Sequence, residues 1–252
     1  TFLKNTNGKF SDVTAQTGIT NNTGWWQSVT AADLDNDGDM DYICGNFGTN
    51  RRFKNTVSEK DGKPLPLEAY SYDFDKNGTL DFLIGYYQHD KLYPVKSRER
   101  LIEQIPSMAD KFPTWDAYGK ATMQDVAGAD LDKALHKTAY VFSSSVFMNQ
   151  GNGKFTMKAL PVEDQFSPMF GTVVDDFNED GILDILTHGN FYNTDIEITR
   201  HDANTGLLLI GKGNGEFTPL RSYQTGFWSD GDTKSLVVLL DKAKEPVYVC
   251  AA

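Results

Sequence analysis

A nine-residue acidic pattern that occurs three times constrains the fold of this chain more than any other feature. The three copies, residues 33–41, 73–81 and 176–184, align without gaps on the form Asp-x-Asp/Asn-x-Asp/Asn-Gly-x-x-Asp. A short run of apolar, β-branched or aromatic residues stands on each side of every copy, and such runs are typical of strands. The repeated unit is therefore predicted to be a β-hairpin whose loop carries carboxylates.

A second repeat lies out of phase with the acidic one. Asn-Gly or Gly-Asn-Gly followed by a Lys or Glu and then Phe occurs at residues 5–10, 149–155 and 211–217. Asn and Gly tolerate positive φ, so this pattern predicts tight hairpin turns between strands. The first two acidic loops begin 40 residues apart at Asp33 and Asp73, which is the length of one four-stranded propeller blade.

Two other segments resemble weakened copies of the acidic loop. Residues 240–249 have the same position after an Asn-Gly turn but lack most of the oxygen side chains. Residues 129–132, which read Ala-Asp-Leu-Asp, resemble the start of a further copy. These observations predict five partial or complete repeats along the chain.

One region breaks the strand pattern. From about residue 97 to residue 138 the apolar residues Leu101, Ile102 and Ile105 recur at helical spacing, and Pro106 and Pro113 are able to open new helices. This predicts a helical insertion. The fold class is accordingly predicted to be all-β, a β-propeller that occupies residues 1–252 as a single domain or part of one, with an incomplete ring as one alternative.

Composition excludes several function classes. The formal net charge of −11 repels phosphate backbones, so no nucleic-acid partner is expected. No run of eighteen apolar residues occurs, so no transmembrane helix is expected.

Cys44 and Cys250 each follow apolar residues and are interpreted as free thiols, with a disulfide between them left open. Both ends of the chain fall inside strand-like runs, and we expect it to be a piece of a longer protein.

The acidic loops have the chemistry of calcium sites. Ca²⁺ takes six to eight oxygen ligands at about 2.3–2.6 Å, and a Gly at the sixth position permits a sharp turn round one ion. We predict about three Ca²⁺ sites, with side chains of the first, third, fifth and ninth positions and the carbonyl of the seventh as ligands. The predicted ligands are Asp33, Asp35, Asp37, Asp39 and Asp41; Asp73, Asp75, Asn77, Thr79 and Asp81; and Asp176, Asn178, Asp180, Ile182 and Asp184.

Two alternatives to these sites were weighed. An EF-hand requires a Glu at the twelfth position, where this chain has Cys44, Ile84 and Thr187. Turns without any metal would leave four oxygen side chains close together, where like charges repel. The EF-hand is therefore excluded, and metal binding is favoured, with dissociation constants on the order of 10⁻⁴–10⁻³ M as in extracellular modules.

The Asp-x-Asp-x-Asp-Gly-x-x-Asp loops and the Asn-x-Gly-Asn-Gly-Lys-Phe turn resemble FG-GAP (VCBS-type) repeats, the calcium-binding blades of integrin α-subunit propellers and of many secreted bacterial proteins. Residues 10–18, Phe-Ser-Asp-Val-Thr-Ala-Gln-Thr-Gly, resemble the start of repeats in bacterial ASPIC/UnbV-associated proteins. The resemblance covers residues 1–95 and 141–252. It implies a propeller fold, bound Ca²⁺ and an extracellular or outer-membrane location.

A repeated aromatic pair supplies candidate ligand-binding residues. Trp25 and Trp26 follow a Gly, as do Phe227 and Trp228. The pairs either pack between blades or present rings for sugars or a protein partner. Further side chains after the loop-flanked strands were expected to line the same face, namely Arg51, Arg52, Tyr86, Tyr87 and His89.

Three functions follow from these residues. The first is a non-catalytic, calcium-stabilised binding or scaffold module that meets a protein or glycan at the cell surface. The second is a carbohydrate-active enzyme, a polysaccharide lyase or hydrolase, which needs paired carboxylates or a Tyr/His base outside the calcium loops. The third is an accessory subunit of an outer-membrane nutrient-uptake complex, which rests on the resemblance alone.

Overall fold

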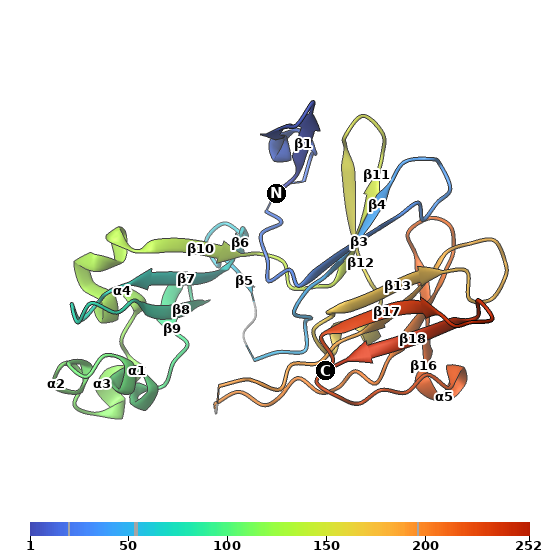
Figure 1. The fold of residues 1–252 in the computed structure, drawn as a ribbon. Helices are drawn as coiled ribbons and strands as arrows, with labels where there is room; N and C mark the ends of the chain where they lie inside the picture. The colour runs from blue at the N-terminus through green and yellow to red at the C-terminus, as the bar shows by residue number, and fades with distance from the viewer. Residues whose placement is uncertain (20, 53–54, 196) are drawn as a thin grey trace. The chain divides into compact units, whose positions relative to one another are not determined.

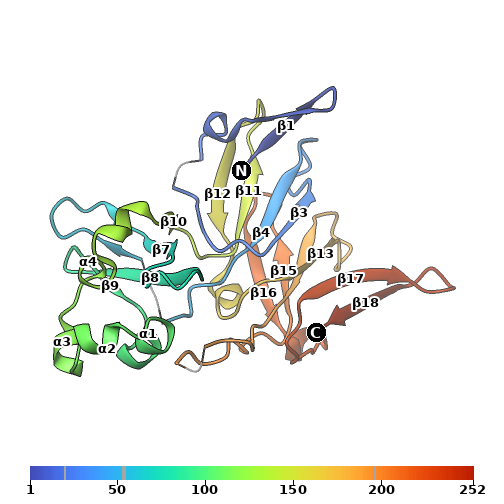
Figure 2. The same ribbon diagram turned by 60° about the vertical axis from the view of Figure 1, so that its left-hand side comes forward.

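The computed structural model describes residues 1–19, 21–52, 55–195 and 197–252. The chain forms two compact units (Figures 1 and 2). Unit 1 contains Thr1–Arg52 and Val141–Ala252, and unit 2 contains Phe53–Tyr140. Most of the regular structure is strand, and every paired strand is antiparallel to its neighbours, so the predicted all-β class is confirmed.

Unit 1 is built of two four-stranded sheets and two separate hairpins. The sheets have the orders β12-β11-β4-β3 and β13-β14-β15-β16, and the hairpins are β1–β2 and β17–β18. The strands are β1 (Leu3–Thr6), β2 (Lys9–Asp12), β3 (Ser28–Ala32), β4 (Asp41–Gly45), β11 (Ser145–Asn149), β12 (Phe155–Ala159), β13 (Gly171–Asp175), β14 (Asp184–His188), β15 (Leu207–Gly211), β16 (Phe217–Arg221), β17 (Ser235–Leu240) and β18 (Pro246–Ala251). Short helices η1 (Thr14–Gln16), η3 (Val162–Gln165) and α5 (Ser222–Thr225) connect them.

The first blade of unit 1 is assembled from distant parts of the sequence. Strand β4 pairs with β11, so that Cys44 lies opposite Ser145. Unit 2 is therefore inserted between the second and third strands of this blade. The 40-residue spacing of the first two acidic loops was expected to span one blade, and this expectation is wrong. The two loops belong to different units, because each acidic pattern specifies only its own hairpin and not the strands that complete the sheet.

The first strands of the successive sheets of unit 1 lie side by side, with β13 between β3 and β17 (Figure 1). This is a propeller-like arrangement, and the series of sheets in unit 1 stays open and does not close into a ring. The core beneath these strands is aliphatic. Its fully buried members are Ile43, Val146, Met169, Ile185 and Leu209.

Unit 2 combines a sheet with short helices. Strands β7 (Leu67–Tyr72), β8 (Asp81–Gln88), β9 (Lys91–Pro94) and β10 (Leu135–Ala139) form the sheet β10-β7-β8-β9, and β5 (Thr56–Val57) pairs with β6 (Pro64–Leu65). The helices are α1 (Arg98–Gln104), α2 (Met108–Lys111), α3 (Trp115–Gly119), α4 (Met123–Ala127) and η2 (Gly128–Lys133).

The predicted helical stretch is confirmed over residues 98–133, but not to residue 138, because Leu135–Ala139 pairs with β7 as strand β10. Residues 129–132 lie in the 3-10 helix η2, so their interpretation as a weakened acidic loop is wrong. The helices supply much of the apolar core of unit 2. Leu101, Ile105 and Met123 are fully buried there.

The turns predicted from Asn and Gly form as expected. At the β1–β2 turn, Asn7 and Gly8 have φ values of 52° and 82°. The β11–β12 and β15–β16 hairpins coincide with the second and third Asn-Gly segments. Cys44 and Cys250 are both unpaired thiols, as predicted.

Asp164 is a buried acid in the interior of unit 1. The Thr187 hydroxyl donates to its Oδ1 at 2.6 Å, and its Oδ2 has no partner among the residues that the structure describes. Burial raises the pKa of Asp164 to about 7, although the hydrogen bond from Thr187 acts in the opposite direction. The folded chain therefore retains this proton to a higher pH than the unfolded chain does.

Asp164→Asn should remove part of the pH dependence of stability. Because the folded pKa is raised, the wild-type protein loses stability as the pH rises from about 4 through 7, after which the loss levels off. The unfolding free energy of the variant minus that of wild type should therefore increase between pH 5 and pH 7. Urea unfolding of both proteins at pH 5, 6, 7 and 8 checks this, and a constant difference would contradict it.

Candidate metal centres

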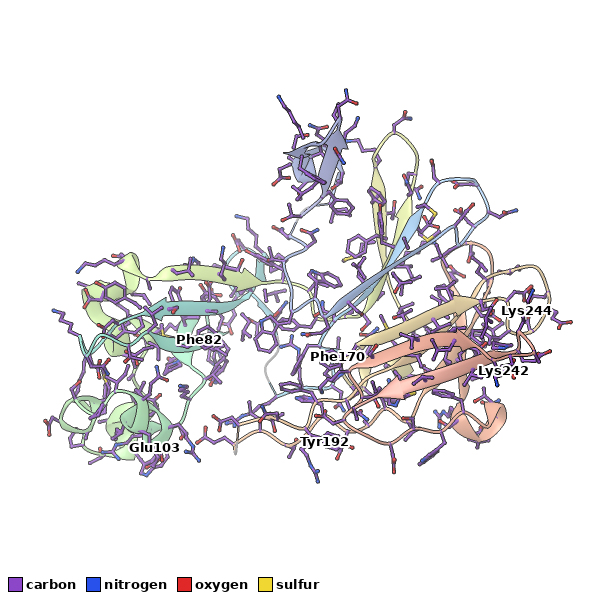
Figure 3. The ribbon with its side chains drawn as sticks, in the orientation of Figure 1. Phe82, Glu103, Phe170, Tyr192, Lys242 and Lys244 are labelled. Carbon is purple, nitrogen blue, oxygen red and sulfur yellow. The ribbon has the colours of Figure 1, made fainter. Side chains whose placement is uncertain are left out.

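The three acidic loops connect equivalent hairpins. Residues 33–41 join β3 to β4, residues 73–81 join β7 to β8, and residues 176–184 join β13 to β14. In a fourth hairpin, β17–β18, the turn keeps only Asp241 from the pattern, and Lys242 and Lys244 lie at its tip (Figure 3). The prediction of a weakened loop over residues 240–249 is confirmed only for the turn at residues 241–245, because Leu240 ends β17 and residues 246–249 belong to β18.

The backbone of all three loops follows the same path. The fourth residues, Asn36, Lys76 and Glu179, have φ values of 58°, 60° and 59°. At the sixth position Gly38 and its two equivalents have φ between 85° and 91°. The Gly was expected from the pattern, whereas the left-handed fourth residue was not, because Lys and Glu give no sequence signal for positive φ.

The first-position carboxylate fixes the loop from inside. Asp33 accepts the backbone N–H groups of Asp37 and Gly38 at 3.1 and 3.0 Å. Asp73 accepts those of the fifth and sixth residues of its loop, both at 2.9 Å, and Asp176 does so at 3.1 and 2.8 Å. These bonds curl the chain, and in the first two loops two later carboxylates lie close to the first one.

The ninth-position aspartate joins the loop to the rest of the unit. Asp41 Oδ2 accepts the Leu34 N–H at 3.0 Å, while its Oδ1 accepts the Asn149 N–H at 2.6 Å from β11. Asp184 bonds in the same way to Phe177 and to Gly211 of β15. Asp81 accepts the Phe74 N–H and the side-chain amide of Gln104, on helix α1. This role was not predicted, since the sequence does not show which strand lies beyond the hairpin.

The ninth-position carboxylates of unit 1 also have raised pKa values. Burial raises the pKa of Asp41, and repulsion from Asp35 and Asp37 adds to the increase while the backbone hydrogen bonds oppose it. The pKa of Asp184 is raised by burial and by Asp180 and Asp176 in the same manner. A cation in either loop would favour the ionised carboxylates and reverse this effect.

The third and fifth positions distinguish the loops from one another. In the second loop the Asn77 side-chain amide donates to Asp75 at 3.0 Å, and in the third loop Asn178 donates to Asp180 at 3.0 Å. The first loop has Asp at both positions and so has no amide donor. There, Oδ1 of Asp35 is shielded from solvent and has no hydrogen-bond partner among the residues described by the structure.

These oxygens fit a hard cation. Carboxylate oxygens of Asp33, Asp35 and Asp37 lie within 4.8 Å of one another, as do those of Asp73, Asp75 and Asp81. The N–H groups of the seventh residues, Asp39, Thr79 and Ile182, are held by the fifth-position side chains at 2.8, 2.7 and 2.8 Å. Their carbonyls remain predicted ligands, and an oxygen-only donor set of this kind suits Ca²⁺ rather than a softer metal.

The predicted aromatic pairs are largely occupied in packing. Trp25 contacts Phe47 and Phe142 edge-to-face, with ring centroids 5.1 and 5.6 Å apart. The Trp26 indole N–H donates to the Asn22 carbonyl at 2.9 Å, and Phe227 lies against Gly206. Trp228, at 67% exposure, is the most open of the four.

A buried carboxylate in unit 2 gathers groups that sequence analysis did not bring together. Glu68 on β7 accepts the Tyr87 hydroxyl at 3.0 Å and the Tyr70 hydroxyl at 3.4 Å, and it pairs with His136 of β10. The Tyr70 and His136 rings stack at 4.7 Å. Burial, followed by the Glu68 charge, raises the pKa of Tyr87 to about 12. His136 is 68 residues from Glu68, so only the β7–β10 register could have revealed this cluster.

Asp184→Ala should destabilise the protein even in the presence of a chelator, because two backbone N–H groups, a buried one on Gly211 and a partly buried one on Phe177, lose a charged acceptor. We expect a loss of roughly 2–4 kcal/mol. Asp241→Ala is the matched control, since Asp241 also accepts two backbone N–H groups, from Ala243 and Glu245, but at an exposed turn. Its loss should be about 1 kcal/mol or less. Denaturant unfolding in EDTA measures both, and equal losses would contradict the structural role.

Comparison with known proteins supports this description. Residues 1–44 match the family model described as FG-GAP-like repeat, a span that contains the β1–β2 hairpin, β3, the first acidic loop and most of β4. No curated protein matches the chain in sequence. None of the helices that the structure describes has the length and apolar character needed to cross a membrane. The match makes residues 1–44 similar to an FG-GAP-like repeat and supports an FG-GAP repeat protein, and the two further acidic hairpins share the loop geometry of the matched one.

Proposed function

We propose that the protein is a calcium-stabilised, non-catalytic binding or scaffold module that acts at an extracellular or outer-membrane surface. FG-GAP repeats suggest such a module. The observation that carries the calcium part of the proposal is the first acidic loop. Its clustered carboxylates include a shielded oxygen of Asp35 without a partner among the described residues, as a cation ligand would be in the metal-free chain.

Charge supports an order of affinity among the three sites. Loop 33–41 offers aspartate at the first, third, fifth and ninth positions, whereas the other two loops each replace one of these by Asn. Calcium affinity rises with the number of charged ligands. The first loop is therefore proposed as the tightest site, and the second and third as weaker ones.

Bound ions would act on the sheet as well as on the loop. The ninth aspartate touches the second residue of its loop and also a neighbouring element, β11 for Asp41 and β15 for Asp184. An ion that orders the loop would thus hold this aspartate against the third strand of the blade. In this proposal calcium secures the scaffold and the partner binds elsewhere on it.

The partner is proposed to be a protein or a glycan. The helices of unit 2 are one candidate contact surface, where Trp115 is 58% exposed. Deletion of residues 97–138 would not test this, because Leu101, Ile105 and Met123 belong to the core. Substitution of Trp115 tests this contact surface without removing residues of the core. An accessory subunit of an outer-membrane nutrient-uptake complex is a variant of the same proposal.

A second candidate function is favoured by the cluster of unit 2. A carbohydrate-active enzyme needs a His or Tyr base held by a carboxylate, and Glu68, His136, Tyr70 and Tyr87 provide those groups. A panel of acidic and neutral polysaccharides, assayed for new reducing ends or unsaturated products, separates the two functions. If activity is lost in His136→Gln and retained in the exposed control His89→Gln, the enzyme is favoured over the non-catalytic binding module.

Removal of calcium should lower the melting temperature of the proposed module. At 10 mM, Ca²⁺ is at about 10 to 100 times the predicted dissociation constants, so each independent site contributes about 1.4–2.7 kcal/mol and EDTA should lower the melting temperature by several degrees. Differential scanning calorimetry in EDTA and in 10 mM Ca²⁺, with equilibrium dialysis to count retained ions, checks the expectation. An unchanged melting temperature together with no retained Ca²⁺ would remove the proposal.

Asp35→Asn should weaken the tightest site by about tenfold or more, because it removes one charged ligand. The control is Asp61→Asn, at an exposed turn of unit 2 outside the acidic loops. Its calcium titration should superimpose on that of wild type. Equal calcium titrations for Asp35→Asn and wild type would show that the first loop does not hold the ion.

A further inference from the structure

Unit 1 contains a cavity of about 330 Å³ that gathers cationic side chains in a chain of net charge −11. Two segments form most of its wall, residues 50–52 after β4 and residues 197–203 in the long connection between β14 and β15. Arg51, Arg52 and Arg200 line it together with His201. Such a concentration of arginine is unexpected in an acidic protein unless it meets negative charge.

Arg51 is the most constrained of these side chains. Its Nε and Nη1 atoms are shielded from solvent, and neither has a hydrogen-bond partner among the residues that the structure describes. The guanidinium lies over the ring of Phe142, which in turn contacts Trp25. Burial lowers the pKa of Arg51 to about 9, so that it remains charged at neutral pH. A partly buried charge that lies on one aromatic ring and has unpartnered donors is costly unless an anion supplies the missing hydrogen bonds.

A second guanidinium and a histidine line the cavity from the connection between β14 and β15. Arg200 lies over the Tyr192 ring at 4.9 Å, and Tyr192 belongs to the same long connection (Figure 3). His201 packs edge-to-face on Phe47 at 4.7 Å. Burial lowers the pKa of His201, and the Arg51 charge adds to this while Asp202 opposes it. At neutral pH the imidazole is therefore an uncharged hydrogen-bonding group.

Two acids also line the cavity and limit what it accepts. The negative charges of Glu197 and Asp202 offset part of the positive charge of the three arginines. Arg52 is already engaged, since it donates to the Glu197 carbonyl at 3.3 Å. The remaining cationic capacity lies with Arg51 and Arg200, which suits one compact anionic group rather than a polyanion.

We propose that this cavity binds a single oxyanion group, a carboxylate, sulfate or phosphate, with Arg51 as the principal donor and Arg200 as the second. A guanidinium offers paired N–H donors that match the oxygens of such a group. Phe166, 41% exposed in the cavity wall, offers an apolar surface on which a sugar ring can lie. The inference rests on the proposed binding function and gives it a ligand class.

The test uses the full calcium-loaded chain and four probes: sodium sulfate, sodium D-glucuronate, glucose, and sodium chloride at matched ionic strength. Sulfate and glucuronate should each raise the melting temperature in a saturable way, and glucose and chloride should not. A stronger response to glucuronate assigns the site to a sugar-borne oxyanion, and equal responses assign it to a free anion. No response to either anion beyond that to chloride would overturn the proposal.

Arg51→Met should weaken anion binding at least tenfold in isothermal titration. It should also raise the melting temperature in anion-free buffer, because an unpaired charge leaves a buried position; a purely structural arginine would show the opposite. Arg51→Lys, which keeps the charge but loses the paired donors, should weaken binding severalfold and serves if the Met variant does not fold. Arg221→Gln, an exposed arginine of unit 1 outside the cavity, is the control and should bind as wild type.

Unchanged anion affinity in both Arg51 variants would overturn the assignment. Calcium retention, measured separately by equilibrium dialysis, keeps the two proposals apart. Loss of anion binding with three retained ions counts against the cavity alone. Anion binding by a chain that retains no Ca²⁺ counts against the calcium-stabilised module and leaves the cavity assignment in place.

Discussion

Carboxylates crowded into one tight turn repel one another, and each acidic hairpin can form only if this repulsion is offset. Loop 33–41 places five aspartates in nine residues, and backbone N–H groups offset only part of their charge. The first-position carboxylate is satisfied by two N–H groups of its own loop, and the ninth by the loop and the next strand. The oxygens in between have fewer donors, and the unpartnered Oδ1 of Asp35 shows where the balance is least complete.

The same constraint explains why the loops tolerate different degrees of loss. In the second and third loops an Asn amide substitutes for part of the missing positive charge by donating to a neighbouring carboxylate. In the β17–β18 turn only Asp241 remains, and it accepts two N–H groups without any crowding. The hairpin therefore persists through the whole series, whereas the number of aspartates in its loop falls from five in residues 33–41 to one in the β17–β18 turn.

Local features of the fold could be predicted from the sequence, and long-range ones could not. Strand runs, Asn-Gly turns and the three full acidic loops depend on consecutive residues, and these form where predicted, whereas the short Ala-Asp-Leu-Asp segment at residues 129–132 was too brief to distinguish a loop from the helix η2. The pairing of β4 with β11 and of Glu68 with His136 depends on residues far apart, for which one sequence carries no signal. The cationic cavity could not be predicted for the same reason, since Arg51 and Arg200 come from separate segments of the sequence.

The insertion of unit 2 within a single blade has a consequence for how the chain folds. The β13–β16 sheet is made of neighbouring segments, so its contacts are local and form at small entropic cost. Strand β4, in contrast, can pair with β11 only after Ser145 and the residues that follow it have been synthesised, and this pairing spans the whole inserted unit. The cost of closing so long a loop grows only with the logarithm of its length. Exchange or enlargement of the inserted unit would therefore slow completion of the first blade far more than it would lower the stability of the finished protein.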